Sequence, residues 1–198
     1  ESLERLRPAE ALKVIRQGRL ATQMPAFGEI LTDEQTRQLA EWIYRPVTPT
    51  PQWNEASIRQ SQVVDAAAVA LPAVPGPRLA GVDPHNLFVV VETGDHHVSL
   101  VDGDKLVRLF RFPSRYALHG GPKFSPDGRF VYFASRDGWI SKFDLYHQVV
   151  VAEIRAGLNT RNAAVSSDGK WVMVANYLPR NLVVLDAGDL SLVKIIPA

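Results

Sequence analysis

Residues 125–144 read SPDGRFVYFASRDGWISKFD, and residues 166–186 read SSDGKWVMVANYLPRNLVVLD. Both segments begin with a turn that contains Asp-Gly, continue through an apolar run typical of a β-strand, and end a second such run with aspartate. The aspartates Asp102, Asp144 and Asp186 follow one another at intervals of 42 residues. A repeat of about 40–45 residues with four strands is typical of a β-propeller blade. The sequence therefore predicts consecutive propeller blades.

The predicted strands are short runs rich in Val, Ile, Phe and Tyr. A blade buries its faces only against its neighbours, and closed propellers have about four to eight blades. The two and a half repeats in residues 85–198 are too few for a ring, so we expect more chain after Ala198 and an N-terminus that begins in mid-domain. The predicted runs are Phe88–Glu92, His97–Val101, Phe130–Ala134, Ile140–Phe143, Trp171–Ala175 and Leu182–Leu185.

The first 46 residues have a different pattern. Apolar residues from Leu3 to Ile15 recur at helical spacing, and we predict a helix from Pro8 to Gln17 that stops at Gly18. A second helix is predicted after Thr32, which can cap it, with Gln35 at the reciprocal capping-box position. Between the two helices, residues 21–28 read ATQMPAFG and are expected to form an irregular loop.

A proline-rich segment separates these helices from the strands. Seven prolines lie between residues 46 and 84, a density that disfavours regular helix or central strand through most of the segment. The run from Ala66 to Leu71 is apolar, so we expect this part to pack against a neighbour. The domain boundaries that follow are residues 1–46, a linker over 47–84, and blades over 85–198.

Composition excludes several classes of function. The net charge of +1 gives no support for binding to nucleic acid or to a polybasic membrane surface. The chain has no cysteine, which excludes disulfides, thiol nucleophiles, iron–sulfur clusters and covalent attachment of a c-type haem within it. No apolar run approaches the roughly 18 residues of a membrane span, and the first residues lack the pattern of a signal peptide.

His119 is the strongest candidate among the five histidines. It lies in Tyr116-Ala117-Leu118-His119-Gly120-Gly121, where glycines clear space, shortly before the turn of a blade. Loops that enter blades line the face on which propellers bind ligands, so His119 could coordinate a metal. The alternative is a structural histidine that holds a turn. The remaining histidines, His85, His96, His97 and His147, read as turn or surface residues.

Other side chains could complete a site around His119. Arginine binds carboxylates with two parallel hydrogen bonds, so arginines at the ends of strands would suit a ligand that carries several carboxylates. Solvated surface charge is the alternative for each of them. Tyr177 could add a hydroxyl or simply pack, and Met24 could be core filler or an axial ligand of iron. The arginines expected in loops beside strands are Arg115, Arg136, Arg161 and Arg180.

A known family shares this series of motifs. The helical region contains Met24-Pro25-Ala26-Phe27-Gly28, Leu31-Thr32-Asp33-Glu34-Gln35 and Leu39-Ala40-Glu41-Trp42-Ile43-Tyr44; the later part contains Pro51-Gln52-Trp53, Tyr116-Ala117-Leu118-His119, Ser135-Arg136-Asp137-Gly138 and Asn159-Thr160-Arg161. The ordered series resembles the cytochrome cd1 family over essentially the whole chain. The resemblance implies a mainly β fold, namely part of an eight-bladed propeller that holds haem d1, preceded by the C-terminal helices of a class I cytochrome c domain that holds haem c.

The resemblance also implies residue roles. Met24 would be the axial ligand of haem c, and His119 the proximal ligand of the iron in haem d1. Arg136 and Arg161 would hold carboxylates of the macrocycle, with Tyr177 beside them. Arg115 is a further candidate for contact with the cofactor.

One difference from the family's sequence pattern distinguishes between branches of the family. Where the nitrite-reducing members have an arginine after the first propeller strand, this chain has Val91-Glu92-Thr93-Gly94. With Asn176-Tyr177-Leu178-Pro179, this favours the branch that makes haem d1. The resemblance thus implies oxidation of dihydro-haem d1 to haem d1 in the periplasm, with electrons passing to haem c and then to a periplasmic acceptor, and contact with other proteins of haem d1 biosynthesis or nitrite reduction. The alternatives are a nitrite reductase that forms nitric oxide and a carrier of haem d1 without enzyme activity.

Overall fold

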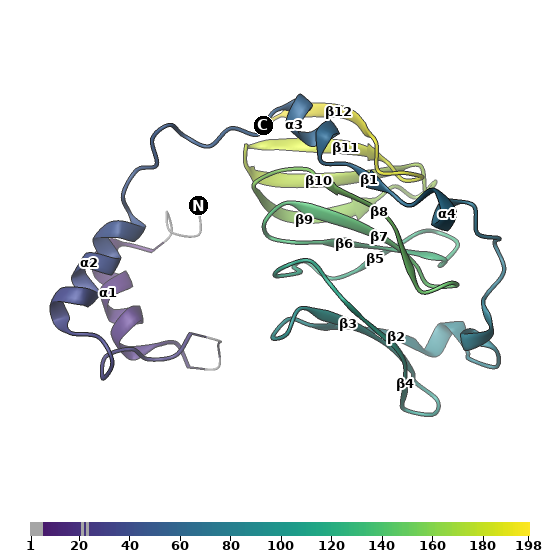
Figure 1. Cartoon of the computed structure of the whole chain (residues 1–198), viewed down its shortest axis with the longest axis horizontal. Helices are drawn as coiled ribbons and strands as arrows, with labels where there is room; N and C mark the ends of the chain where they lie inside the picture. The colour runs from purple at the N-terminus through teal and green to yellow at the C-terminus, as the bar shows by residue number, and fades with distance from the viewer. Residues whose placement is uncertain (1–5, 21, 23) are drawn as a thin grey trace. The chain divides into compact units, whose positions relative to one another are not determined.

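The computed structural model describes residues 6–20, residue 22 and residues 24–198 (Figure 1). The chain divides into two compact units, one that extends to Gln52 and one from Trp53 to Ala198. Each unit has its own packed elements. The expectations for Leu3, Ala21 and Gln23 lie outside the described residues.

The two helices predicted in the first unit are present: α1 (Pro8–Gln17) has the predicted bounds, and α2 (Asp33–Ile43) begins after Thr32 as predicted. The Thr32 side chain accepts a hydrogen bond from the Gln35 amide at 3.2 Å, and the Gln35 side chain accepts one from the Thr32 amide at 2.9 Å. This capping box satisfies donors that a helix N-terminus otherwise leaves unpaired. The helices pack through small or branched apolar residues: Ala11, Ile15 and Ala40 are buried.

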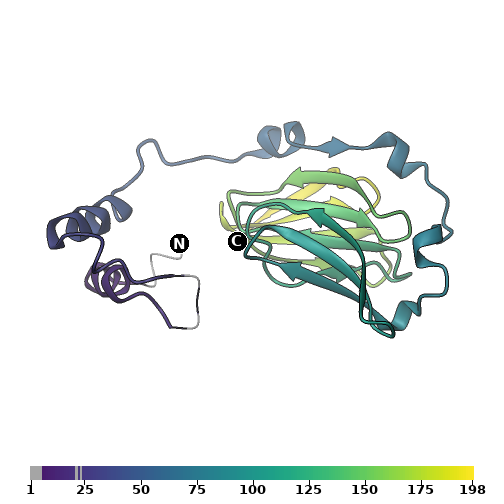
Figure 2. The ribbon, with the colours of Figure 1, turned by 60° about the horizontal axis from the view of Figure 1, so that its bottom comes forward.

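From Trp53 onward, the proline-rich segment lies along the outside of the sheets of the second unit (Figure 2). It contains short elements and not one continuous coil. Trp53 Nε1 donates to the Arg155 carbonyl at 2.9 Å, and Ile58 is fully buried. The apolar run expected to pack forms a helical turn in which Ala68 is buried. The elements are α3 (Glu55–Gln60), β1 (Val63–Val64), α4 (Ala66–Val69), η1 (Pro77–Leu79) and η2 (Pro84–Asn86).

Three antiparallel sheets follow, in the strand orders β2-β3-β4, β5-β6-β7-β8 with β1 added beside β8, and β9-β10-β11-β12. They are stacked in chain order, from the first sheet at the bottom of Figure 1 to the third at the top. The strands are β2 (Leu87–Glu92), β3 (His97–Asp102), β4 (Val107–Pro113), β5 (Lys123–Phe124), β6 (Phe130–Ala134), β7 (Trp139–Asp144), β8 (Val149–Arg155), β9 (Asn159–Val165), β10 (Trp171–Leu178), β11 (Asn181–Asp186) and β12 (Leu192–Pro197).

The repeated aspartates occupy the same position in each of the three sheets. Asp102, Asp144 and Asp186 end β3, β7 and β11, and one carboxylate oxygen of each accepts a hydrogen bond from the amide two residues later. This local bond holds the turn into the next strand, as short polar side chains do in turns. The mainly β fold built of successive propeller-type blades is confirmed.

The core lies between the sheets. Between the first and second sheets, the rings of Phe112 and Phe143 stack with centroids 4.1 Å apart. Between the second and third sheets, Ile140, Ile154 and Val172 are fully buried. The second sheet is therefore packed on both faces, and the first and third sheets each bury one face against it.

One positional expectation was wrong. Arg161 lies within β9 and not in a loop beside a strand. The strand reads NTRNAAV, in which polar residues outnumber apolar ones, so its sequence lacks the β-branched run that predicts strands. β9 forms the edge of its sheet, where polar side chains can face solvent.

Candidate functional site

His119 lies in a loop whose backbone is unusual. Ala117, Gly120 and Gly121 have φ angles of +46°, +86° and +71°. Only residues without a large side chain adopt such angles at low cost, which accounts for the two glycines. The His119 amide donates to the Ala134 carbonyl at 2.8 Å, and Leu118 forms an isolated β-bridge with Ser135. The loop is thus attached to the end of β6.

The imidazole of His119 contacts the third sheet. Its Nδ1 lies 3.2 Å from the main-chain carbonyl oxygen of Arg161. A carbonyl oxygen can only accept, so this bond requires the proton on Nδ1 and leaves the lone pair on Nε2. Histidines that bind metals are commonly oriented by such a bond from their second nitrogen. His119 is half-buried, and in its neutral form the lone pair lies on Nε2, the nitrogen that does not contact the carbonyl.

Arg136 and Arg161 lie beside this histidine. The Arg136 amide donates to the Ala117 carbonyl at 3.0 Å, and the Thr160 amide donates to the Arg136 carbonyl at 3.0 Å. Both arginine side chains are exposed. Within the part of the chain that the structure describes, neither guanidinium has an ion-pair partner. Two positive groups are therefore available next to His119.

Tyr177 lies on the neighbouring strand. β10 pairs with β9 through Asn176–Thr160 and Leu178–Asn159, so the extra residue Tyr177 forms a bulge at the same end of the sheet. The buried Asn176 supports the bulge, because its side chain accepts from the Thr160 hydroxyl at 2.6 Å and donates to the Ala156 carbonyl at 2.9 Å. Bulges commonly redirect side chains next to binding sites.

Arg115 is engaged elsewhere. Its Nε donates to the carboxylate of Glu153 at 3.0 Å, and its guanidinium lies 3.8 Å from the centre of the Trp139 ring. The same carboxylate also accepts from the Ser141 hydroxyl. The structure therefore does not bring Arg115 together with Arg136 and Arg161 as an available cation, and its role toward a ligand stays a prediction.

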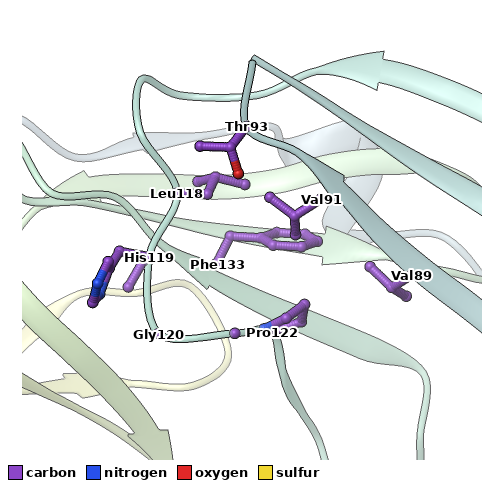
Figure 3. Close-up of a pocket in the computed structure, with 10 residues that line it drawn as sticks. Val89, Val91, Thr93, Leu118, His119, Gly120, Pro122 and Phe133 are labelled. Carbon is purple, nitrogen blue, oxygen red and sulfur yellow. The ribbon is translucent and has the colours of Figure 1, made fainter. Parts of the chain in front are cut away.

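A cavity of about 380 Å³ lies beside the His119 loop (Figure 3). The wall that the first sheet contributes consists of Val89 and Val91 on β2 and of Thr93 just after it. These are every second residue, so their side chains point to the same face. Phe133 lies in the middle of the view, and the imidazole of His119 lies at the rim, away from Val91. The lining contains no charged side chain. The cavity therefore suits an apolar part of a ligand, whereas the arginines suit its anionic part.

Glu92 stands next to Thr93 but is already paired. Its carboxylate accepts from Arg111 Nε at 3.0 Å and from the Ser99 hydroxyl. These bonds lower the pKa of Glu92 to about 2, with the hydrogen bond from Arg111 as the largest cause. Glu92 is therefore anionic at neutral pH, and Arg111 balances its charge.

Met24 lies in the first unit, in the loop after α1. The residue is half-buried, and its carbonyl oxygen accepts from the Arg19 amide at 3.0 Å. Gly18 is required nearby, because a β-carbon there would lie 2.7 Å from the Met24 carbonyl oxygen. The loop is thus fixed by its backbone, and ligation by the Met24 sulfur stays a prediction.

Sequence reasoning missed two residues around the histidine, Lys123 and Asn162. The Lys123 ammonium donates to the Gly120 carbonyl at 2.6 Å, and the Asn162 side chain packs against Gly120. The available signal was the pair of glycines after His119, which indicates that other groups approach the backbone closely. The pattern could not say which groups these are.

These contacts define a class of protein: one with β-propeller blades that bring a histidine and two exposed arginines together through main-chain contacts. The chain belongs to the family described as "Cytochrome D1 heme domain", whose sequence profile matches residues 82–198. Those residues therefore belong to a domain that binds a d1-type haem.

Individual relatives agree with this family. The chain is 60% identical over all 198 residues to dihydro-heme d1 dehydrogenase of Pseudomonas aeruginosa, covering 40% of that protein. It is 37% identical over 114 residues, 57% of this chain, to Protein NirF of the same organism, covering 29% of it. A solved structure of dihydro-heme d1 dehydrogenase NirN in complex with DHE matches with a TM-score of 0.80 and 60% identity, over all of this chain and 42% of that one.

The chain thus spans about two fifths of the length of the relative with which it shares 60% identity. None of the helices among the described residues is long and apolar enough to cross a membrane. The described residues also contain no cluster of three or more His, Cys, Asp or Glu side chains that could hold a metal ion.

Proposed function

We propose that this chain is part of an enzyme that oxidises dihydro-haem d1 to haem d1, the last step in making that cofactor. The observation that carries the proposal is the 60% identity to dihydro-heme d1 dehydrogenase over the full 198 residues. An identity of this size extends through the helices and the proline-rich segment as well as the blades, so it supports the same domain arrangement.

The geometry around His119 fits a d1-type macrocycle. The Nδ1 contact with the Arg161 carbonyl leaves Nε2 of the neutral imidazole as the nitrogen that would bind the iron. Arg136 and Arg161, which have no ion-pair partner among the described residues, would bind the ring carboxylates, and Tyr177 lies on the strand that pairs with β9. In this role His119 and the two arginines would hold the tetrapyrrole in one orientation.

The cofactor, when bound, supplies the redox chemistry. Conversion of a propionate side chain to an acrylate removes two electrons and two protons from the substrate. The residues of this chain bind and orient the substrate for that loss. We propose that the electrons pass to a haem c and from there to a periplasmic electron acceptor.

The first unit supports the haem c part of the proposal. We propose that the two helices of residues 1–46 and the Met24 loop form the C-terminal part of a class I cytochrome c domain, in which the Met24 sulfur would bind the iron of haem c. We propose residues 47–84 as the linker and residues 85–198 as the first blades of the haem d1 propeller. We also propose that the enzyme lies in the periplasm, with other proteins of haem d1 biosynthesis or nitrite reduction as partners.

The test uses the full-length protein incubated with dihydro-haem d1 and an oxidant. We expect the visible spectrum to change to that of haem d1, with haem c reduced when the external oxidant is withheld. An unchanged spectrum would contradict the proposal. Evolution of nitric oxide from nitrite with a reduced donor would instead favour the nitrite reductase, and binding of the pigment without either reaction would favour a carrier.

A further inference from the structure

The peptide that follows His119 is held by two side chains from different strands. Gly120 and Gly121 have positive φ angles, so regular β-structure does not fix their carbonyl groups. A β-carbon on Gly120 would lie 2.3 Å from Asn162 Oδ1, which shows that this side chain of β9 forms a wall against the loop. The carbonyl oxygens of Gly120 and Gly121 must therefore accept hydrogen bonds from groups outside a regular β-ladder.

Lys123 supplies these donors. Its ammonium donates to the Gly120 carbonyl at 2.6 Å and to the Gly121 carbonyl at 3.2 Å. The backbone of Lys123 is fixed in β5, where it pairs with Tyr132 of β6. The side chain therefore reaches from a strand back to the loop, and it joins the peptide after His119 to the same sheet that holds the His119 amide.

The ammonium has no competing carboxylate. Among the described residues, no Asp or Glu lies within ion-pairing distance of Lys123, whereas Lys105 and Lys170 each pair with an aspartate. A charged donor makes stronger hydrogen bonds to carbonyl groups than a neutral one. The Lys123 side chain is half-buried, and both hydrogen bonds of its ammonium go to the loop that bears His119.

We propose that Lys123 is a positioning residue for the tetrapyrrole site: by fixing the carbonyls of Gly120 and Gly121, it sets the direction of the His119 imidazole. The inference rests on the proposed role of His119 as the iron ligand. Lys123 does not touch the iron, and it acts through the peptide after the histidine. The Nδ1 bond to Arg161 holds one side of the imidazole, and the lysine prevents the loop from turning about that bond.

The experiment compares Lys123→Met, which keeps the length of the side chain but removes the ammonium, with Lys123→Arg in the full-length protein. The matched control is Lys170→Met, because Lys170 is exposed and pairs only with Asp168 at 3.4 Å. We expect Lys123→Met to weaken haem d1 binding about tenfold, the size of one lost charge-assisted hydrogen bond, and to give a mixed axial-ligand signal in the electron paramagnetic resonance spectrum. Lys123→Arg is expected to restore a single signal.

The melting temperature of the protein without haem d1 separates positioning from simple loss of stability. We expect Lys123→Met and Lys170→Met to melt at similar temperatures. Wild-type affinity and a single ligand signal in Lys123→Met would overturn the inference about Lys123, as would a weaker affinity explained fully by a lower melting temperature. Failure of the wild-type protein to bind haem d1 at all, or normal binding in His119→Ala, would instead overturn the proposed function on which it rests.

Discussion

The two ends of the blades differ in how closely they repeat. At the end with the Asp-Gly turns, Asp127 accepts from the Ser125 hydroxyl and the Arg129 amide, and Asp168 makes the same pair of bonds one blade later. At the opposite end, the second sheet carries the His119 loop and the third carries the bulge at Tyr177. Side chains that recur in successive blades hold the same turn in each blade. Side chains that occur in one blade alone are the candidates for binding a ligand.

This comparison predicts two kinds of effect. Substitutions at the end with the repeated turns should lower the stability of the fold, and substitutions at the other end should lower the affinity for haem d1.

The largest effect is expected for Asp144→Ala. Asp144 is fully buried, and its carboxylate pairs with Arg129 at 2.7 Å and contacts His147 at 3.1 Å. Removing it leaves a buried guanidinium without its partner.

Loss of one member of a buried ion pair costs about 3–5 kcal/mol, so we expect the midpoint of urea unfolding to fall sharply in Asp144→Ala. Haem d1 affinity, measured where the variant is still folded, should remain near the wild-type value. A large loss of haem d1 affinity without a change in the unfolding midpoint would contradict the assignment of stability to one end of the blades and ligand binding to the other.

The next effect is expected at His119. Replacing it with alanine removes the proposed iron ligand, and we expect haem d1 affinity to fall by roughly hundredfold or more, equivalent to about 3 kcal/mol. Stability without haem d1 should change little, because the side chain is only half-buried. A spectrophotometric titration measures the affinity, and an unchanged dissociation constant would remove His119 from the site.

A smaller effect is expected for the arginines. Arg136→Gln and Arg161→Gln each remove one guanidinium that is predicted to bind a carboxylate, and we expect each to weaken haem d1 binding about tenfold. Arg108→Gln is the control, because Arg108 is exposed on β4 in the first sheet. Equal losses in all three variants would indicate a general charge effect instead of specific contacts.

The smallest effect concerns Glu92, which lies at the binding end but is paired with Arg111. Folding lowers its pKa from the usual 4.5 to about 2, so its ionised form favours the folded state above pH 4.5. This contribution is lost as the pH falls through about 2. We expect Glu92→Gln to reduce the loss of stability between these pH values, measured by thermal unfolding, with haem d1 affinity at neutral pH unchanged.

Local signals in the sequence predicted local structure well. The capping box at Thr32 and the aspartates at the ends of β3, β7 and β11 act through neighbours a few residues away, so a pattern reveals them. β9 escaped prediction because its strand conformation comes from pairing with β10 and not from its own polar residues.

The site was harder to predict, because its contacts join distant residues through backbone groups. The Nδ1 of His119 meets a carbonyl oxygen on Arg161, which every residue possesses, so no pattern of side chains reveals that partner. Arg115 shows the converse: its type suits a carboxylate ligand, but Glu153 on a neighbouring strand already provides a carboxylate within the protein. Residue type thus predicts what a side chain can bind, and packing decides what it does bind.

The most direct test of the central claim is pulsed electron paramagnetic resonance of the full-length protein with haem d1 bound and its histidines labelled with nitrogen-15. We expect a strong coupling between the d1 iron and one labelled imidazole nitrogen, and its loss in His119→Ala. A coupling of the same strength in His119→Ala would show that another residue is the ligand and would contradict the account of this site.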